Sequence, residues 1–147
     1  MRTMKMGGFT AVELMVVLIV MAILVAIAFP SYQESVLKSK RVEGRAALMK
    51  LMQQQERYYS LHARYLVFSV ASDDEAQGFR WYSGDNPQNS LYEISAQACE
   101  GKDIRDCVKL RAVPGTQNVN RNYSDLACGT LVLTSEGNKS ADADHCW

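Results

Sequence analysis

The apolar residues of this chain form one long unbroken run, followed by two different periodic patterns. Residues 14–29 are all apolar, and with residues 9–12 the apolar segment reaches 21 positions, interrupted only by Thr10 and Glu13. An α-helix rises 1.5 Å per residue, so about 20 residues cross the hydrocarbon core of a bilayer. Inside lipid the backbone must satisfy its own hydrogen bonds, which favours a helix despite the many β-branched residues. The run therefore predicts a membrane-spanning helix.

After Pro30 the pattern becomes that of an amphipathic helix. Apolar and aromatic side chains, joined by one glutamine, recur at spacings of three, four and seven. They are Leu37, Leu48, Leu51, Met52, Gln55, Tyr58 and Tyr59. Charged residues occupy much of the remaining surface: Lys38, Lys40, Arg41, Glu43, Arg45, Lys50 and Glu56. No turn signal separates the two segments, so we expect one rod of 52 residues over positions 9–60, about 78 Å long.

The last third of the chain shows the alternation of β-strands. Residues 91–96 and 108–113 alternate between two faces, and 130–134 is a short run rich in β-formers. Turn residues separate these segments, whereas residues 62–90 are irregular. An antiparallel sheet lying on the second half of the helix would bury the apolar faces of both. The predicted fold class is therefore α+β, with a long N-terminal α-helix packed on a small antiparallel β-sheet.

The carboxylate of Glu13 is unusual at its position near one end of an apolar helix. A charge there costs several kcal/mol unless it finds a partner, so Glu13 indicates function by default. A secretory signal peptide is an alternative explanation of the segment. Its small-residue cleavage site would follow the apolar run, whereas here Gly7 and Gly8 precede the run and no Ala-x-Ala follows Phe29.

Charge and cysteine content narrow the choice of function. The chain has 16 basic and 16 acidic residues, so no strong field for nucleic acid or anionic lipid follows from its net charge. The four cysteines all lie in the last third, with no C-x-x-C pair. In an exported protein an even number of cysteines indicates disulfides rather than metal ligands, and three pairings are possible.

Several segments together resemble the type IV pilin family, and the PilE-type minor pilins within it. The N-terminal match is GFTAVEL at residues 8–14, followed by the apolar run and by PSY at 30–32. Further matches are KSKRVEG at 38–44, QERYY at 55–59, CGTLVLT at 128–134, Gly137 and the ending Cys146-Trp147. The resemblance covers both ends of the chain and hardly touches the middle, roughly residues 60–90.

The resemblance implies a division of the chain into three parts. Residues 1–8 would be a prepilin leader peptide, 9–30 the transmembrane and filament-core helix, and 31–147 a periplasmic head that includes the amphipathic half of the helix. A prepilin peptidase would cut between Gly8 and Phe9, and Phe9 would be N-methylated. The orientation rests on this resemblance, because basic residues flank the apolar run on both sides at similar density.

The resemblance also implies roles for individual residues. Glu13 would pair with the N-terminal amine of a neighbouring subunit, although a carboxylate that merely reaches the interface is an alternative. Pro30 would kink the helix, because it lacks a backbone donor. The family's C-terminal loop bridge favours a Cys128–Cys146 disulfide, which leaves Cys99–Cys107 as the second. The 17 residues between Cys128 and Cys146 would give this bridge about 3 kcal/mol.

We predict that the protein is not an enzyme and carries no cofactor or metal. The sequence has no phosphate-binding loop, dinucleotide fingerprint, zinc-protease motif or nucleophile elbow. His62 and His145 lie far apart in the sequence, and we expect both at the surface. The acidic triplet at residues 73–75 lacks the spacing of a calcium loop and is expected to be a solvated surface run.

The leading functional hypothesis is a minor type IV pilin that resides in the inner membrane and is then built into an extracellular pilus. Its partners would be other pilin subunits, the inner membrane, the prepilin peptidase and the pilus assembly machinery. Pili of this family serve adhesion, twitching motility or DNA uptake. A type II secretion pseudopilin is an alternative, although pseudopilins commonly use calcium where this chain has Cys128 and Cys146.

Another alternative is a surface pilin that binds DNA or a host ligand. Five basic residues could form a patch, with Trp81 or Tyr92 for stacking. They are Lys102, Arg105, Lys109, Arg111 and Arg121. Acidic residues interleave with them (Glu100, Asp103 and Asp106). A mixed, solvated surface is therefore the default expectation for this region.

Overall fold

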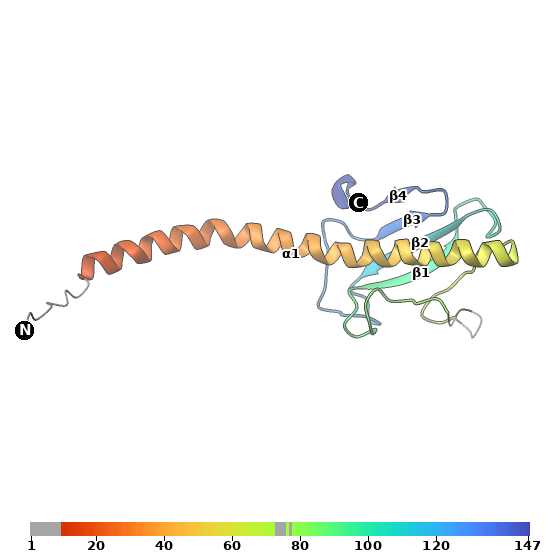
Figure 1. Ribbon diagram of the computed structural model, residues 1–147, viewed down its shortest axis with the longest axis horizontal. Coiled ribbons are helices and arrows are strands. Elements are labelled where there is room, and N and C mark those ends of the chain that lie inside the picture. Colours follow the sequence, from red (N-terminus) through yellow and green to blue (C-terminus); the bar gives the residue numbers. More distant parts are fainter. Residues whose placement is uncertain (1–9, 73–75, 77) are drawn as a thin grey trace, which may run out of the picture. The chain divides into compact units, whose positions relative to one another are not determined.

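The computed structural model describes residues 10–72, 76 and 78–147 of the chain. One long helix, α1 (Ala11–His62), precedes four strands, β1 (Tyr92–Ala98), β2 (Val108–Pro114), β3 (Leu131–Thr134) and β4 (Lys139–Ser140) (Figure 1). A short 3-10 helix, η2 (Asp144–Cys146), follows at the C-terminal end. The chain divides into two units within α1, between Leu37 and Lys38. Each unit is described by itself.

Helix α1 has 52 residues, which agrees with the rod expected at 9–60 after a shift of two positions. Its first turn is closed by Thr10 and Glu13, whose reciprocal hydrogen bonds satisfy donors that a helix start leaves free. Its last turn ends at Ala63, which adopts a φ of 53° and donates its N–H to the carbonyl of Tyr59 at 2.8 Å. This left-handed residue is a common helix stop, although glycine more often occupies the position.

In the first unit the apolar side chains of α1 are exposed all round. Large side chains from Val12 to Phe29 are between 50% and 69% exposed. A helix that is hydrophobic on every face is stable only where something else surrounds it. By length and composition, α1 contains a segment apolar enough to cross a membrane. Pro30 lies inside α1, and the kink at this position remains a prediction.

In the second unit one stripe of α1 is buried. The buried positions recur every three or four residues: Arg41, Gly44, Leu48, Leu51 and Gln55. The predicted stripe is therefore correct at its centre, but the placement of Arg41 among the solvated charges was wrong. Its guanidinium finds a carboxylate on the sheet side of the molecule, and this partner makes burial of the charge tolerable.

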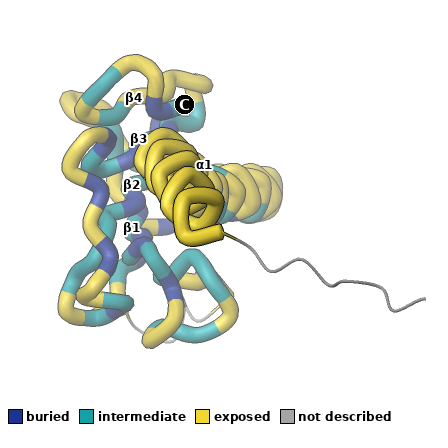
Figure 2. Tube along the Cα trace, turned by 90° about the vertical axis from the view of Figure 1, so that its left-hand side faces the viewer, coloured by how far each residue is buried: buried dark blue, intermediate teal, exposed yellow. Residues whose placement is uncertain are grey.

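The four strands form one antiparallel sheet in the order β1-β2-β3-β4. The predicted alternation is confirmed, because Tyr92, Ile94 and Ala96 are buried on β1 while their neighbours are more exposed. On β2 the buried set is Val108, Leu110 and Ala112. The sheet packs on the second half of α1 as expected, and Figure 2 shows the buried segments gathered along the strands. Strand β4 was not predicted, because it has only two residues and both are exposed.

The connection from α1 to β1 covers the outer edge of β1. Phe68 pairs with Ala96 and Tyr82 pairs with Glu93 through isolated antiparallel bridges. Gln55 of α1 holds the start of this connection, since its side chain bonds both the N–H and the carbonyl of Leu66. The irregular segment expected here therefore protects a sheet edge that would otherwise be free to pair with other chains.

Candidate interaction surfaces

The first candidate residue, Glu13, lies in the first turn of α1. Its Oε2 accepts hydrogen bonds from the N–H and the Oγ1 of Thr10, both at 2.9 Å. In return the N–H of Glu13 donates to Thr10 Oγ1 at 3.3 Å. The pair Thr10 and Glu13 forms a capping box, a signal that the T-x-x-E spacing carries and that sequence reasoning missed. The predicted cleavage site at Gly8 and Phe9 lies outside the described residues.

The four cysteines form two disulfides with the pairing that the family resemblance favoured. Cys99–Cys107 closes the loop between β1 and β2, with 5.4 Å between the Cα atoms. Cys128–Cys146 joins the loop before β3 to η2, with 5.6 Å between the Cα atoms. His145 lies within 4.8 Å of the second bridge. The sulfur atoms of that bridge are bonded to each other and are not thiolate ligands. The acidic triplet at residues 73–75 lies outside the described part of the chain.

A buried ion pair connects α1 to the loop before β3. The guanidinium of Arg41 donates to both carboxylate oxygens of Asp125, at 2.6 and 2.8 Å. Burial by itself raises the pKa of Asp125, but hydrogen bonds from Arg41 and from the N–H of Cys128 outweigh it and lower this pKa below its ordinary value. The ion pair therefore fixes the loop before β3 on α1.

Two tyrosines beside this ion pair complete the polar part of the core. The hydroxyls of Tyr92 and Tyr123 are 2.8 Å apart. Burial, followed by the hydrogen bond with Tyr123, raises the pKa of Tyr92. Tyr92 is fully buried, so the suggestion that it stacks on a nucleic-acid base was wrong. Trp81 is partly exposed and lies edge-on against Tyr82.

The five basic residues of the suggested patch do not form one cluster. Lys102, in the β1–β2 loop, pairs with Glu136. Arg121 lies beyond β2 and donates to the carbonyl of Gln117. Lys109 and Arg111 share the face of β2 that points away from the core, because they alternate with its buried residues. Arg105 is exposed in the β1–β2 loop. The structure therefore retains one adjacent pair of the five, Lys109 and Arg111.

Three polar residues and one apolar residue of the neighbouring strands flank the Lys109–Arg111 pair. In the register of the sheet, Lys109 lies between Gln97 and Thr134, and Arg111 lies between Ser95 and Val132. In the part of the chain that the structure describes, neither cation has a hydrogen-bond or salt-bridge partner for its side chain. We call Lys109, Arg111 and their polar neighbours Ser95, Gln97 and Thr134 the outer-face row.

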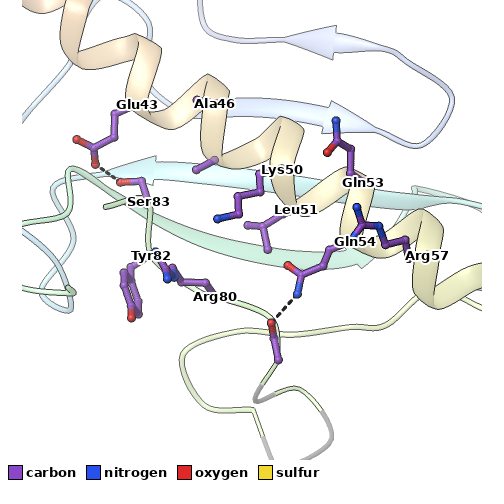
Figure 3. A pocket seen from close by; sticks show the side chains of 12 residues that line it. Glu43, Ala46, Lys50, Leu51, Gln53, Gln54, Arg57, Arg80, Tyr82 and Ser83 are labelled. Atoms are coloured by element: carbon purple, nitrogen blue, oxygen red, sulfur yellow. Dashed lines mark hydrogen bonds between the residues drawn. The ribbon is translucent and has the colours of Figure 1, made fainter. Parts of the chain in front are cut away.

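A second surface with basic character is a groove between α1 and the segment 78–83. Its volume is about 550 Å³, and Figure 3 shows its lining side chains. Three cations line it: Lys50 and Arg57 from α1, and Arg80 from the facing segment. Sequence reasoning did not find this groove, because no local pattern links residues of α1 to a segment more than twenty positions later.

Comparison with known proteins decides the family. The sequence model described as "Type IV minor pilin ComP, DNA uptake sequence receptor" matches residues 30–132, more than half of the chain. The chain belongs to this family of type IV minor pilins. The leading hypothesis from the sequence, a minor type IV pilin, is confirmed.

Two solved structures are similar to this minor pilin. A type IV pilin from Shewanella oneidensis is 25% identical, with 75% of this chain and 96% of that chain covered and a TM-score of 0.47. The non-core minor pilin PilV of Neisseria meningitidis is 21% identical, with 73% and 90% covered and a TM-score of 0.44. No curated protein matches the sequence.

Proposed function

We propose that this minor pilin is a DNA-binding subunit of a type IV pilus and that the outer-face row contacts the phosphate backbone. The observation that carries the proposal is the match over residues 30–132 to a family described as a DNA uptake sequence receptor. The net charge of the whole chain is zero, so binding must rely on a local group of cations rather than on an overall field.

The spacing within the outer-face row suits a phosphate backbone. Lys109 and Arg111 are two positions apart on β2, which places their Cα atoms about 6.6 Å apart along the strand. One DNA strand carries a phosphate about every 3.4 Å of helix axis, so the separation spans about two such steps and each cation can meet a different phosphate. Gln97, Ser95 and Thr134 add neutral polar groups beside them. Such contacts position DNA without selecting its sequence.

The experiment is a titration of fluorescein-labelled duplex DNA with the full-length protein in detergent micelles at several salt concentrations. The double variant Lys109→Gln/Arg111→Gln should bind more weakly, and the slope of log K against log salt should fall by about 1.8, or 0.9 per lost contact. Lys139→Gln is the matched control. Lys139 is on β4, outside the outer-face row, and its ammonium group lies over the ring of Trp147. An unchanged slope in the double variant would overturn the assignment of the surface, and absent binding by the unaltered protein would overturn the function.

We also propose how the subunit is processed and held in the membrane before assembly. We infer that residues 1–8 are removed as a leader, that Phe9 becomes the methylated N-terminus, and that residues 9–30 hold the protein in the inner membrane with the head, 31–147, in the periplasm. The exposed apolar side chains of α1 support this inference. Mass spectrometry of the mature chain checks it, since an N-terminus beyond Pro30 is incompatible with a membrane-held pilin.

The remaining roles follow the same inference. We propose that Glu13 pairs with a neighbour's N-terminal amine, that Pro30 kinks the helix, and that the pilus assembly machinery inserts the subunit. Pilins are structural proteins in general, and we propose that this one too is not an enzyme. The PilE-type subclass rests on the combination of the N-terminal and C-terminal matches, among them GFTAVEL at residues 8–14 and CGTLVLT at 128–134, and also stays a proposal.

A further inference from the structure

Among the described residues, three cations and one carboxylate line the groove between α1 and the segment 78–83. In the same residues, the side chains of Lys50 and Arg57 have neither a hydrogen bond nor a salt bridge. Arg80 donates to the carbonyl of Gly84 at 3.0 Å and lies over the ring of Tyr82, and neither contact involves a carboxylate. A ligand with negative charges would be attracted to this lining.

Among the described lining residues, Glu43 is the one carboxylate, and it already has hydrogen-bond partners. Glu43 Oε1 accepts hydrogen bonds from the hydroxyl of Ser83 and from the N–H of Leu91, the latter at 3.1 Å. It therefore ties the segment 78–83 and the start of the sheet to α1 instead of neutralising a cation. Figure 3 shows Glu43 at one end of the groove and Arg57 toward the other, with Lys50 between them.

The floor of the groove is apolar and shallow. Ala46, Ala47 and Leu51 of α1 contribute it, and the two alanines leave room that larger residues would fill. The stretch of helix from Glu43 to Arg57 spans about 21 Å at the helical rise. An extended peptide of about six residues has the same length. Gln54 fixes the opposite wall, because its Nε2 donates to the carbonyl of Gly78 at 2.7 Å.

We propose that this groove docks an extended acidic segment of a neighbouring pilus subunit. Carboxylates of such a segment would meet Lys50, Arg57 and Arg80, while alternate small apolar side chains would lie on the alanine floor. Because the chain belongs to a pilin family, the proteins that surround it in a pilus are other pilin subunits. The complementary charges would select the partner's register as well as its identity.

The groove fits nucleic acid less well. Single-stranded nucleic acid gains much of its affinity from stacking on aromatic rings. The ring of Tyr82 is covered by Arg80 at 5.3 Å and contacted edge-on by Trp81. The groove also lies against α1, whereas the outer-face row lies on the face of β2 that points away from the core. Docking here is thus separate from the DNA contact proposed for the outer-face row.

A peptide titration tests the chemistry of the groove. The probe is a fluorescein-labelled, amidated peptide of sequence Glu-Ala-Glu-Val-Glu-Ala, added to the full-length protein in detergent micelles. We expect saturable binding of the peptide. The Lys50→Gln/Arg57→Gln variant should bind it about tenfold more weakly. A version of the peptide with Gln in place of each Glu should bind the unaltered protein more weakly by a similar factor. Lys109→Gln/Arg111→Gln is the matched control and should leave peptide binding unchanged.

Three outcomes of the titration would overturn the proposal. Equal binding of the Glu and Gln peptides would show that charge does not matter. Equal binding by the Lys50/Arg57 variant would place the peptide elsewhere. Tighter binding of a six-nucleotide single strand, lost in the same variant, would assign the groove to nucleic acid. Because DNA affinity is measured separately on the outer-face variant, failure here leaves the proposed function standing.

A photo-crosslinking experiment tests the groove in assembled pili. A benzophenone amino acid at Gln53, an exposed lining residue, should join to a pilin subunit at a peptide with at least two acidic residues. Lys50→Glu/Arg57→Glu should reduce the yield of this product at least tenfold. A product whose peptide has no acidic residue, or a yield unaffected by the charge reversal, would contradict the docking proposal.

Discussion

The two halves of α1 have the same backbone conformation and opposite relations to their surroundings. In the first half, residues 11–29, every large apolar side chain is at least half exposed. In the second half, Leu48, Leu51 and Gln55 are buried against the rest of the head, at 0%, 4% and 0% exposure. Helical structure alone therefore does not determine what a helix buries. The second half is buried by its own chain, whereas no described part of the chain buries the first half.

The polar residues of the two halves show the same difference. Within the head, Arg41 and Gln55 are buried because Asp125 and Leu66 of the same chain supply their hydrogen bonds. In the first half, Glu13 has only Thr10, one turn away, as a partner in the described residues. A buried polar group must be paired wherever it lies. The buried polar residues Arg41 and Gln55 therefore find their hydrogen-bond partners within the head, whereas Glu13 has a described partner only in its own helical turn.

Asp125→Asn is the substitution that should lower the stability of the head most. The substitution keeps the shape but leaves the buried Arg41 charge without its counter-charge, which should cost about 3–5 kcal/mol of the free energy of unfolding. Urea unfolding of the full-length protein in micelles, followed by near-ultraviolet circular dichroism of the head, measures this loss. Ser124→Asn, at the exposed neighbouring position, is the control and should change stability little.

The pH dependence of the same pair has a definite sign. The pKa of Asp125 is lower in the folded state than its ordinary value. The ion pair therefore stabilises the head fully above about pH 4, the unfolded pKa of aspartate, and this stability is lost as the pH falls through the folded pKa. Asp125→Asn should remove that part of the acid dependence. If the variant and the unaltered protein lose stability in parallel on acidification, the ion pair is not the cause.

Glu13→Ala should affect the other half of the comparison, the part that depends on its surroundings. If Glu13 pairs with a neighbour's amine, its loss leaves that buried charge unpaired, on the order of 3 kcal/mol per contact. We expect normal cleavage and membrane levels, unchanged unfolding of the head, and loss of the protein from sheared pili. The measured quantity is its ratio to the major pilin. A wild-type ratio would show that the carboxylate serves only the capping box with Thr10.

The smallest effect is expected for Gly44→Ala, at a position where α1 approaches Tyr92 of β1 closely. A Cβ at this position would lie 2.9 Å from two ring atoms of Tyr92. The ring has little room to move, because it is fully buried and its hydroxyl bonds Tyr123. Overpacking should exceed the gain in helix propensity and leave a net loss of about 1 kcal/mol.

Thermal unfolding of the head, with Gly78→Ala as control, measures the Gly44→Ala effect. An added Cβ at Gly78 has no described atom within 4 Å, so the control should be neutral. A Gly44→Ala protein more stable than the parent would mean that α1 shifts on the sheet to make room for the methyl group.

Sequence reasoning predicted the local elements well and the long-range pairs poorly. The continuous helix, the three longer strands and the alternation on β1 and β2 follow from periods of 3.6 and 2 that are visible in the chain. Arg41 was placed on the solvated surface because its residue type is usually exposed. Its partner lies 84 positions later, and no periodic pattern reports such a distance.

The sequence by itself determined the membrane-like length of the apolar run, the sheet-forming segments and the even set of cysteines. These are properties of residue types and spacings along one segment, which local backbone geometry and burial fix. Only the tertiary structure decided which cations are paired and which are free. Lys102 meets Glu136 and Arg41 meets Asp125, whereas Lys50, Arg57, Lys109 and Arg111 have no carboxylate partner among the residues that the structure describes. A charge is neutralised by whatever the fold brings within a few ångströms of it, and that is set by the packing of α1, the sheet and their connections together.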